Sequence, residues 1–480
     1  MKPNFVKIGM ISAVAILICG LILLYVFSFN LKWKLLHLAF LFHFLLLYLS
    51  LKSDKNIINP LNLFLATVMF LYLLKFLLIE GFENVNLRFV NFPKDRYDAL
   101  YIKSIAFICL GSLFFYLGYS CKIFDNFIKR IPKIRFKKTN IKSLNFFMIL
   151  LIVIGTIAMI NLIYLKGGLI SAISKMAFYR THSPEQTPNF MYVLMTYLPL
   201  GAVIGIIFYM SWFWQRKNLF ARLMLLMCLI LISFLLYIAT GSRFQSIAPI
   251  FSFLVIYKLQ KKKLKIRSFI PVFLAMIVVI SIMGIFRDIS RSKSAKYIFV
   301  KRVNYHMNNL AWSVGYNLNG PSGLMSILHI VPKRIKPSYG FTFIQAFITM
   351  FPRTLIPFFK GRETIGNFIA QIVAPVRFEK GGGFAPSIYG MFYLNFMLPG
   401  IILLSFLFGI FSHSIYEYSV FNLSNFQVFN FTFYSIIFIY GFLEFFRSGD
   451  IIKISNNVFS LLLLFILAVL FSRIFPLRLE

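Results

Sequence analysis

Four short motifs combine arginine or glycine with serine or proline beside long apolar runs. They are residues 240–243 (Thr-Gly-Ser-Arg), 351–353 (Phe-Pro-Arg), 381–390 (Gly-Gly-Gly-Phe-Ala-Pro-Ser-Ile-Tyr-Gly) and 446–450 (Phe-Arg-Ser-Gly-Asp). Arginine offers a planar fork of donors that matches phosphate oxygens. Glycine-rich turns and helix starts expose backbone amides to the same kind of group. The motifs therefore predict a site for an anion such as a phosphate.

The candidates for direct action on that anion are Arg243, Arg353 and Arg447. Further cations lie between residues 287 and 387, where the long apolar runs stop. Five of them are candidates for substrate binding, together with two residues of the glycine-rich motif: Arg287, Arg291, Arg362, Arg377, Lys380, Ser387 and Tyr389. The alternative for the triple glycine is a flexible loop without a ligand.

Arg243 is the most informative of the three arginines. The apolar run that follows it extends only from Phe244 to about Leu259, several residues short of a full membrane span. At a rise of about 1.5 Å per residue, Arg243 is expected within the outer half of the bilayer. An arginine at that depth costs at least a few kcal/mol unless it faces a polar cavity or a partner. Anion binding is favoured, with a snorkelling side chain at a helix end as the alternative. For Arg447 the alternative is a structural pair with Asp450.

The elements that must position these residues are transmembrane helices. The chain has 480 residues, a mean hydropathy of +0.81 and only 13% charged residues. That charged share is about half the average of soluble proteins. Apolar runs of roughly 20 residues recur throughout, which is long enough to cross a hydrocarbon core. We predict an all-α polytopic membrane protein. The net charge of +36 would suggest nucleic acid in a soluble protein, but here it suits anionic lipids, and no nucleic acid partner is expected.

About twelve spans are predicted. The runs lie at about 8–29, 35–51, 61–79, 102–120, 144–165, 190–213, 219–239, 244–259, 268–286, 388–410, 428–446 and 452–475. With both termini in the cytoplasm, the basic clusters at 122–142, 216–217 and 261–267 fall inside, in agreement with the positive-inside rule. We therefore predict an N-in, C-in orientation.

In this topology the segment 287–387 is a large outer loop within a single transmembrane domain that covers residues 1–480. Residues 341–351 of the loop are apolar but too short to span, so we expect an interfacial or re-entrant helix there. The four cysteines show no CxxC or Cys/His spacing, and no Asp, Glu and His residues cluster. Neither a metal nor a cofactor is expected.

The motifs resemble those of the Wzy-type polymerases of oligosaccharide repeat units, which include the O-antigen and enterobacterial common antigen polymerases. The residues that carry the resemblance are 240–243, 352–353, Pro386-Ser387 with Gly390 and 393–396, and 447–450. They cover roughly the second half of the chain, and the twelve-span layout also matches. Related sequences are expected to have an acidic residue after the glycine at 390, where this chain has Met391.

The resemblance implies a metal-independent, GT-C-like glycosyltransferase of the bacterial inner membrane. Such an enzyme transfers a growing glycan from undecaprenyl pyrophosphate to the sugar of another lipid-linked repeat unit at the outer face. A chain-length-determining co-polymerase is a possible partner. In this reaction Arg243, Arg353 and Arg447 would stabilise the charge that develops on the pyrophosphate, each by about 3–4 kcal/mol.

A general base must accept the proton of the attacking hydroxyl. The outer-face candidates are Asp288, His306, His329, Glu363, Glu379 and Glu444, of which Glu363 and His306 are favoured. A salt bridge or a helix cap is the alternative for both. Other functions remain open at this stage: an O-antigen ligase, another lipid-linked glycosyltransferase, or a flippase. The sequence does not define the sugars or the linkage.

Overall fold

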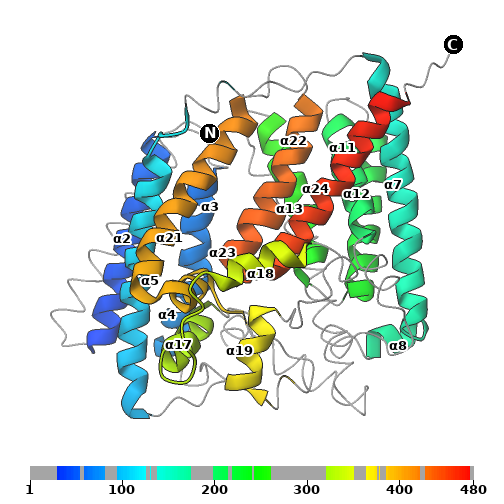
Figure 1. Ribbon diagram of the computed structural model, residues 1–480. Helices are drawn as coiled ribbons and strands as arrows, with labels where there is room; N and C mark the ends of the chain where they lie inside the picture. The colour runs from blue at the N-terminus through cyan, green and yellow to red at the C-terminus, as the bar shows by residue number, and fades with distance from the viewer. Residues whose placement is uncertain are drawn as a thin grey trace.

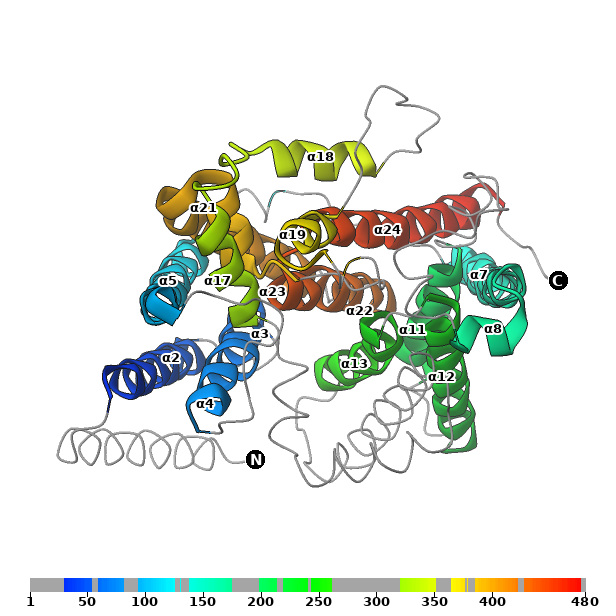
Figure 2. The ribbon, with the colours of Figure 1, turned by 90° about the horizontal axis from the view of Figure 1, so that it is seen from below.

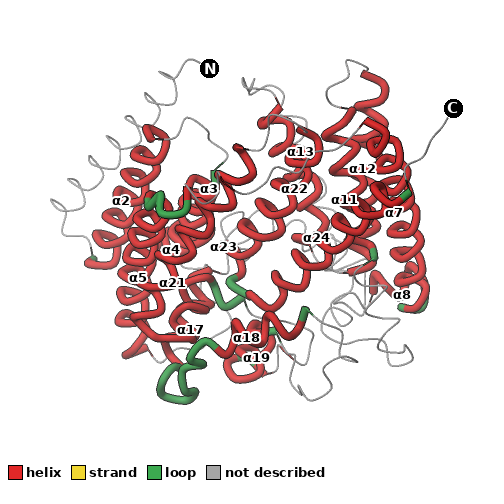
Figure 3. The backbone as a smooth tube through the Cα atoms, turned by 45° about the horizontal axis from the view of Figure 1, so that its top comes forward, coloured by secondary structure: helices red, strands yellow, loops and turns green. Residues whose placement is uncertain are grey.

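The structure, a computed structural model, describes most of the predicted helical core. The described residues are 30–53, 59–81, 94–125, 130, 138–174, 198–213, 219–240, 243–260, 320–350, 364–375, 378, 385–421 and 427–475. Every regular element within them is a helix, and the tube drawing in Figure 3 shows this part of the chain without a strand. The predicted all-α fold is thereby confirmed.

Most of the long helices run side by side as a bundle (Figure 1). In chain order the bundle contains α2 (Leu31–Ser53), α3 (Pro60–Val68), η1 (Met69–Leu73), α4 (Leu74–Gly81), α5 (Lys94–Ser120), α7 (Lys138–Leu165), α11 (Pro199–Phe213), α12 (Leu219–Thr240), α13 (Arg243–Gln260), α21 (Ile388–Phe421), α22 (Gln427–Ile436), η4 (Ile437–Leu443), α23 (Glu444–Ser448) and α24 (Ile451–Ile474).

Four short helices complete the described fold: α8 (Gly168–Ser174), α17 (Gly320–Ile330), α18 (Phe341–Thr349) and α19 (Ile365–Val373). Figure 1 shows α8, α17 and α19 near the lower end of the bundle, with α23 higher than α17 and α19. Seen from below, α18 lies on the outer side of α24, against which it packs (Figure 2).

Within the described ranges, six helices are long and apolar enough to cross a membrane by length and composition. They are Leu31–Ser53, Pro60–Glu80, Arg96–Ser120, Lys142–Leu165, Ile388–Ser419 and Ile451–Ile474. Two shorter apolar helices are Pro199–Tyr209 and Met227–Thr240. The predicted runs 8–29 and 268–286 lie outside the described residues. The number of twelve spans and the N-in, C-in orientation therefore stay predictions, as do the single domain and the large loop at 287–387.

Helix α7 illustrates how these helices face two environments. Among its exposed large apolar side chains, six recur every three or four residues and so form one stripe: Phe146, Ile149, Val153, Ile157, Ile160 and Tyr164. Its other face packs on α11, where a Cβ at Gly155 would collide with the backbone of Ala202. An exposed apolar stripe opposite a close helix contact is typical of a helix at the lipid-facing edge of a bundle.

Helices α5 and α21 have the most extensive contact of any two described helices. A Cβ at Gly118 of α5 would collide with the Phe406 carbonyl, and a Cβ at Gly409 of α21 would collide with the Phe115 carbonyl. Glycine at both positions allows the two backbones to touch, as small residues do in membrane helix pairs. The position of α21 is therefore fixed against α5 along this half of its length.

Helix α21 is broken at Phe396 and Met397, whose backbone angles are not helical. The break frees two carbonyls, which are satisfied by a neighbouring loop: Ser338 N–H donates to the Leu394 carbonyl and Tyr339 N–H to the Asn395 carbonyl, both at 2.9 Å. The Thr342 hydroxyl donates to Asn395 Oδ1 at 2.7 Å. These bonds anchor α18, which covers most of the short apolar stretch predicted at 341–351.

Two π-helical turns interrupt the bundle, η1 between α3 and α4 and η4 between α22 and α23. Such turns insert an extra residue into a helix and recur at functional sites. Here η1 carries Tyr72, and η4 ends directly before Glu444. Both turns therefore lie next to residues of the contact around α23.

Candidate functional site

The motif at 446–450 forms a tight turn between α23 and α24. Gly449 has a φ of +65°, a left-handed conformation that favours glycine. A Cβ at this position would also collide with the Ser387 carbonyl at the start of α21. The turn and the glycine-rich motif, which are far apart in the sequence, therefore touch through their backbones.

Hydrogen bonds join this turn to two other segments. Ser387 N–H donates to the Ser448 carbonyl at 3.0 Å. The buried Tyr72 hydroxyl donates to the Phe446 carbonyl at 2.9 Å and accepts from Ile388 N–H at 3.3 Å. Tyr72 belongs to the π-helical turn η1. It thereby links α21 to α23 and restrains the end of α23.

Glu444, Arg447 and Lys453 form a charged group that we name the inner cluster. The Glu444 side chain is fully buried, whereas 39% of the Arg447 side chain and 36% of the Lys453 side chain are exposed. Arg447 Nε donates to Glu444 Oε2 and Arg447 Nη2 to Glu444 Oε1, both at 2.8 Å. Lys453 Nζ donates to Oε1 at 3.0 Å. One buried carboxylate thus holds two partly exposed cations.

The inner cluster lies against the start of α13. The guanidinium carbon of Arg447 is 5.1 Å from the centre of the Phe244 ring, a cation–π arrangement. Phe244 follows Arg243, at which α13 begins. The structure therefore brings the backbone of the 240–243 motif next to the 446–450 motif. Nothing is described for the side chain of Arg243.

Asp450 is not the partner of Arg447, in contrast to the structural pair considered as an alternative. Its carboxylate accepts from Lys453 N–H at 3.4 Å and from Gly366 N–H at 3.2 Å, so it caps α24 and binds the first turn of α19. Burial raises the pKa of this carboxyl group, although the Gly366 amide and Lys453 oppose the effect. Asp450 thus holds helix starts together rather than a cation.

The family model for O-antigen polysaccharide polymerase Wzy matches residues 8–478. The chain belongs to this family. The curated proteins and the solved structures gave no match. The resemblance predicted from the second half of the chain is confirmed, and the match is wider than predicted because it covers nearly the whole chain.

Membership of the Wzy family defines the general activity. The protein is a multi-pass membrane protein and a glycosyltransferase-type polymerase of O-antigen repeat units, which are lipid-linked oligosaccharides. Of the three arginines predicted to act on an anion, Arg447 is the one whose side chain is described. It lies in a polar cluster with 39% of its side chain exposed, which is compatible with an anion-binding role.

Two predicted substrate-binding residues of this Wzy-family protein are fully buried in the structure. Ser387 has a left-handed φ of +68°, and its hydroxyl accepts from Gly390 N–H at 3.0 Å at the start of α21. Tyr389 packs between helices, and its hydroxyl lies 2.7 Å from Ser112 Oγ. Their contact with substrate stays a prediction, and what is shown is a role in placing α21.

The bonds of Tyr389 continue into a directed chain. His43 Nδ1 lies 2.8 Å from the Ala39 carbonyl, and because a carbonyl only accepts, Nδ1 carries the proton. In a neutral imidazole Nε2 is then the acceptor, so Ser112 donates to it at 2.8 Å and accepts from Tyr389. This chain of hydrogen bonds joins α2, α5 and α21, so His43 has a structural role.

The remaining predicted site residues lie outside the described part of the chain: Arg287, Arg291, His306, Arg353, Arg362, Glu363, Arg377 and Lys380. Their roles stay predictions. Glu444, a less favoured candidate for the general base, is fully buried, and both of its oxygens accept from cations. This arrangement suits a residue that positions cations better than a base that must reach a sugar hydroxyl.

Two lysines near the site were missed by the sequence reasoning. Lys453 interrupts an apolar helix in its first turn, and an ionisable residue in such a helix is itself a functional signal. Lys166 is buried directly after α7, and its ammonium donates to the Ala239 carbonyl, next to the 240–243 motif. Burial lowers the pKa of Lys166 to about 8. Lys166 thus supports the end of α12 from a neighbouring helix.

A second group of cations lies around the end of α17, and we name it the rim cluster: Arg96, His329, Lys333 and Arg334. Lys333 and Arg334 are exposed, and Lys336 is exposed beside them. The pKa of His329 is lowered by burial and by the positive charges of Arg334, Arg96 and Lys333. The local potential at the rim is therefore positive.

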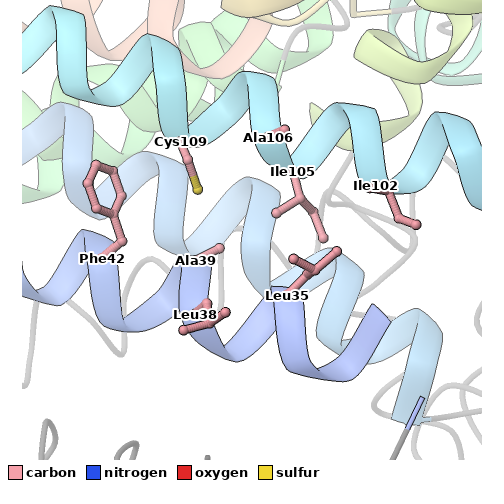
Figure 4. A pocket seen from close by; sticks show the side chains of 8 residues that line it. All are labelled: Leu35, Leu38, Ala39, Phe42, Ile102, Ile105, Ala106 and Cys109. Carbon is pink, nitrogen blue, oxygen red and sulfur yellow. The ribbon is translucent and has the colours of Figure 1, made fainter. Parts of the chain in front are cut away.

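An apolar groove of about 370 Å³ lies between α2 and α5 (Figure 4). Its lining offers no charged group: Leu35, Leu38, Ala39, Phe42, Ile102, Ile105, Ala106 and Cys109. Among the described residues, no group of three or more His, Cys, Asp or Glu side chains could hold a metal. Metal-independent chemistry stays a prediction.

Proposed function

We propose that this protein extends a glycan by moving it from undecaprenyl pyrophosphate to the sugar of another undecaprenyl-pyrophosphate-linked repeat unit. The bond between the anomeric carbon and the pyrophosphate oxygen breaks as a bond to the acceptor hydroxyl oxygen forms. The hydroxyl proton passes to a general base, for which Glu363 and His306 are the candidates. The chemistry is GT-C-like and needs no metal, and it takes place at the outer face of the bacterial inner membrane.

The observation that carries the proposal is the placement of Arg447. The departing undecaprenyl pyrophosphate gains charge as the glycosidic bond breaks, and a fixed cation stabilises that charge more than the ground state. Glu444 holds the guanidinium at 2.8 Å, Phe244 supports it, and 39% of the side chain stays exposed. A cation held in advance needs little reorganisation during the reaction.

Arg243 and Arg353 are proposed to act with Arg447 on the same pyrophosphate. The backbone of Arg243 supports this, since α13 begins there and Phe244 of the same turn contacts Arg447. Arg287, Arg291, Arg362, Arg377 and Lys380 are proposed to bind the rest of the lipid-linked substrate. Anionic lipids around the basic loops and a chain-length-determining co-polymerase are the proposed partners in the membrane.

The test uses purified protein in proteoliposomes with a lipid-linked repeat unit as the sole substrate. A ladder of products that differ by one repeat unit is expected from the wild type. Arg447→Ala is expected to lower the turnover by about 100- to 1,000-fold, as the loss of one electrostatic donor does. Arg447→Lys keeps the charge without the fork of donors and should recover only part of it. The exposed Lys336→Ala serves as the control.

Three results would contradict the proposal. Transfer of a single glycan to a lipid A core, without a ladder, would identify a ligase. Movement of the lipid-linked unit across the bilayer without a new bond would identify a flippase. Ladders of normal length from an Arg243→Ala, Arg353→Ala double variant would reject the arginine mechanism while leaving polymerisation intact.

A further inference from the structure

We propose that Lys453 is a second diphosphate-binding residue, and that Arg447 and Lys453 form one binding site arranged by Glu444. The inference rests on the proposed function, because it concerns the pyrophosphate of the lipid-linked substrate. It adds a residue that lies in a different helix from Arg447. The two cations are brought together by the turn at Ser448, Gly449 and Asp450.

Arg447 and Lys453 share one carboxylate. Arg447 Nη2 and Lys453 Nζ both donate to Glu444 Oε1, at 2.8 and 3.0 Å. Two nitrogens that share one acceptor oxygen are near neighbours, so the two positive charges lie side by side. Unpaired, they would repel each other and extend toward solvent. Glu444 therefore fixes a pair of cations that would not otherwise stay together.

Arg447 and Lys453 have N–H donors that Glu444 does not use. A guanidinium has five N–H donors, and the bonds from Nε and Nη2 to Glu444 use two of them. An ammonium has three donors, and Lys453 uses one on Glu444. No other acceptor for these groups is found among the described residues. Arg447 thus offers three further donors and Lys453 two.

The side chains of Arg447 and Lys453 are accessible, whereas that of Glu444 is not. Glu444 has no exposed surface, whereas 39% of the Arg447 side chain and 36% of the Lys453 side chain are exposed. A ligand that approaches the inner cluster therefore meets the two cations and not the carboxylate. A purely structural ion pair has no need to leave both cations accessible while one carboxylate is hidden behind them.

The two side chains bind phosphate groups in different ways. Arginine binds one phosphate group through parallel N–H donors, whereas lysine acts as a point charge that adapts to a second group. A diphosphate presents two phosphate groups joined through one oxygen, so it can engage both cations at once. An inorganic monophosphate presents one group and needs only one of them. Diphosphate is therefore the ligand class that the pair selects.

The backbone of Lys453 is also hydrogen-bonded. Asp450 Oδ1 accepts from Lys453 N–H at 3.4 Å, while Asp450 Oδ2 accepts from Gly366 N–H at 3.2 Å. The first turn of α24 is thus fixed to α19. Glu444 and Asp450 are positioning residues in this site, and neither is proposed to touch the ligand.

The experiment measures binding, so it does not depend on turnover. Purified full-length protein in detergent, free of divalent cations, is titrated calorimetrically with inorganic diphosphate and with inorganic monophosphate. The variants are Lys453→Met, Lys453→Arg and, as a control at the rim cluster, Lys333→Met. Melting temperatures and elution profiles of each variant establish that it is folded.

Lys453→Met is expected to weaken diphosphate binding at least tenfold and monophosphate binding less than threefold. Lys453→Arg should restore diphosphate binding to within threefold of the wild type, and Lys333→Met should change neither. An equal loss for both anions would show that Lys453 supports the fold and does not select a diphosphate. Unchanged diphosphate binding in Lys453→Met, or no binding by the wild type, would overturn the inference.

The binding experiment tests the role of Lys453 separately from the proposed polymerisation. If the wild type builds a ladder and Lys453→Met binds diphosphate normally, polymerisation stands and the role of Lys453 falls. If diphosphate binding depends on Lys453 but no ladder forms with any repeat unit, the site stands and the polymerisation mechanism falls.

Discussion

The inner cluster and the rim cluster are both rich in cations, but they differ in how the positive charge is balanced. At the inner cluster a fully buried carboxylate holds Arg447 and Lys453 at hydrogen-bond distance. At the rim, Lys333 and Arg334 are exposed, and their charge acts on His329. Water and ions can screen the rim, whereas a cation beside a buried surface needs a fixed counter-charge. A buried counter-charge therefore distinguishes the cations of the inner cluster from the exposed cations of the rim.

The largest expected effect comes from removing both cations of the inner cluster. Arg447→Met with Lys453→Met leaves the Glu444 carboxylate buried without a cation, which is expected to cost about 3–5 kcal/mol of unfolding free energy. Lys333→Met with Arg334→Met at the rim should cost at most about 0.5 kcal/mol. Denaturant unfolding in detergent measures both. Adding Glu444→Leu to the first variant should recover most of the loss, and equal losses in the two clusters would break the comparison.

Gly449 and Gly340 both have a positive φ, but a side chain at Gly449 would meet backbone, whereas one at Gly340 would meet the end of a side chain. At Gly449 an added Cβ collides with the Ser387 carbonyl, whereas at Gly340 it meets the far end of the Phe396 ring at 3.2 Å. Gly449→Ala should cost about 2–4 kcal/mol, from conformational strain and overpacking together. Gly340→Ala should cost about 1–2 kcal/mol, from conformational strain. Melting temperatures of the two variants test the order, and a larger loss at Gly340 would contradict it.

Asp450 provides an intermediate effect. Asp450→Ala removes the acceptor of Gly366 N–H and Lys453 N–H, which is expected to cost about 1–3 kcal/mol. Asp450→Asn keeps one acceptor oxygen and should cost less.

The pH dependence of Asp450 has a definite sign. Burial raises the folded pKa of the carboxyl group above its usual value of 3.8. At a pH between the usual pKa and the raised folded pKa, the folded state binds more protons than the unfolded state. The free energy of unfolding therefore falls as pH rises through this range. Subtracting the stability of Asp450→Asn from that of the wild type at each pH should reveal this decline. A difference that increases with pH would show that the carboxylate is stabilised.

The smallest expected effect concerns the charge field at the rim. The pKa of His329 is lowered by burial, with Arg334, Arg96 and Lys333 adding to the effect. Lys333→Gln with Arg334→Gln should therefore raise the pKa, and salt should shift the pKa of the wild type in the same direction. Titration of a ¹³C-labelled His329 imidazole by NMR measures both. No change in either experiment would mean that burial alone sets the pKa.

The helical fold follows from apolar runs, because each run of sufficient length must satisfy its backbone internally in a membrane. For the same reason the short stretch at 341–351 was correctly expected to be different, and α18 lies there. The two π-helical turns were not predictable from hydropathy, since one extra residue in a helix leaves an apolar run unchanged. Tyr72 lies in one of these turns, and Glu444 directly follows the other.

The pairing of Arg447 shows where sequence reasoning about the site ended. Glu444 and Asp450 are each three residues from Arg447, so spacing alone does not choose between them. The left-handed turn at Gly449 takes Asp450 off the helix, so Glu444 on the same helix face becomes the partner. Lys453 joins the cluster only because the chain reverses there, a three-dimensional contact that no local pattern contains.

The break in α21 has a consequence for the variation that the protein can tolerate. Its two freed carbonyls are bound by backbone N–H groups of Ser338 and Tyr339, not by their side chains. Most substitutions at these two positions therefore preserve the connection between α21 and α18. Proline is the exception, because it lacks the N–H group. Residue 338 is thus free to vary as long as it can donate from the main chain, whereas residue 339 must also adopt a left-handed φ of +45°, which disfavours β-branched side chains.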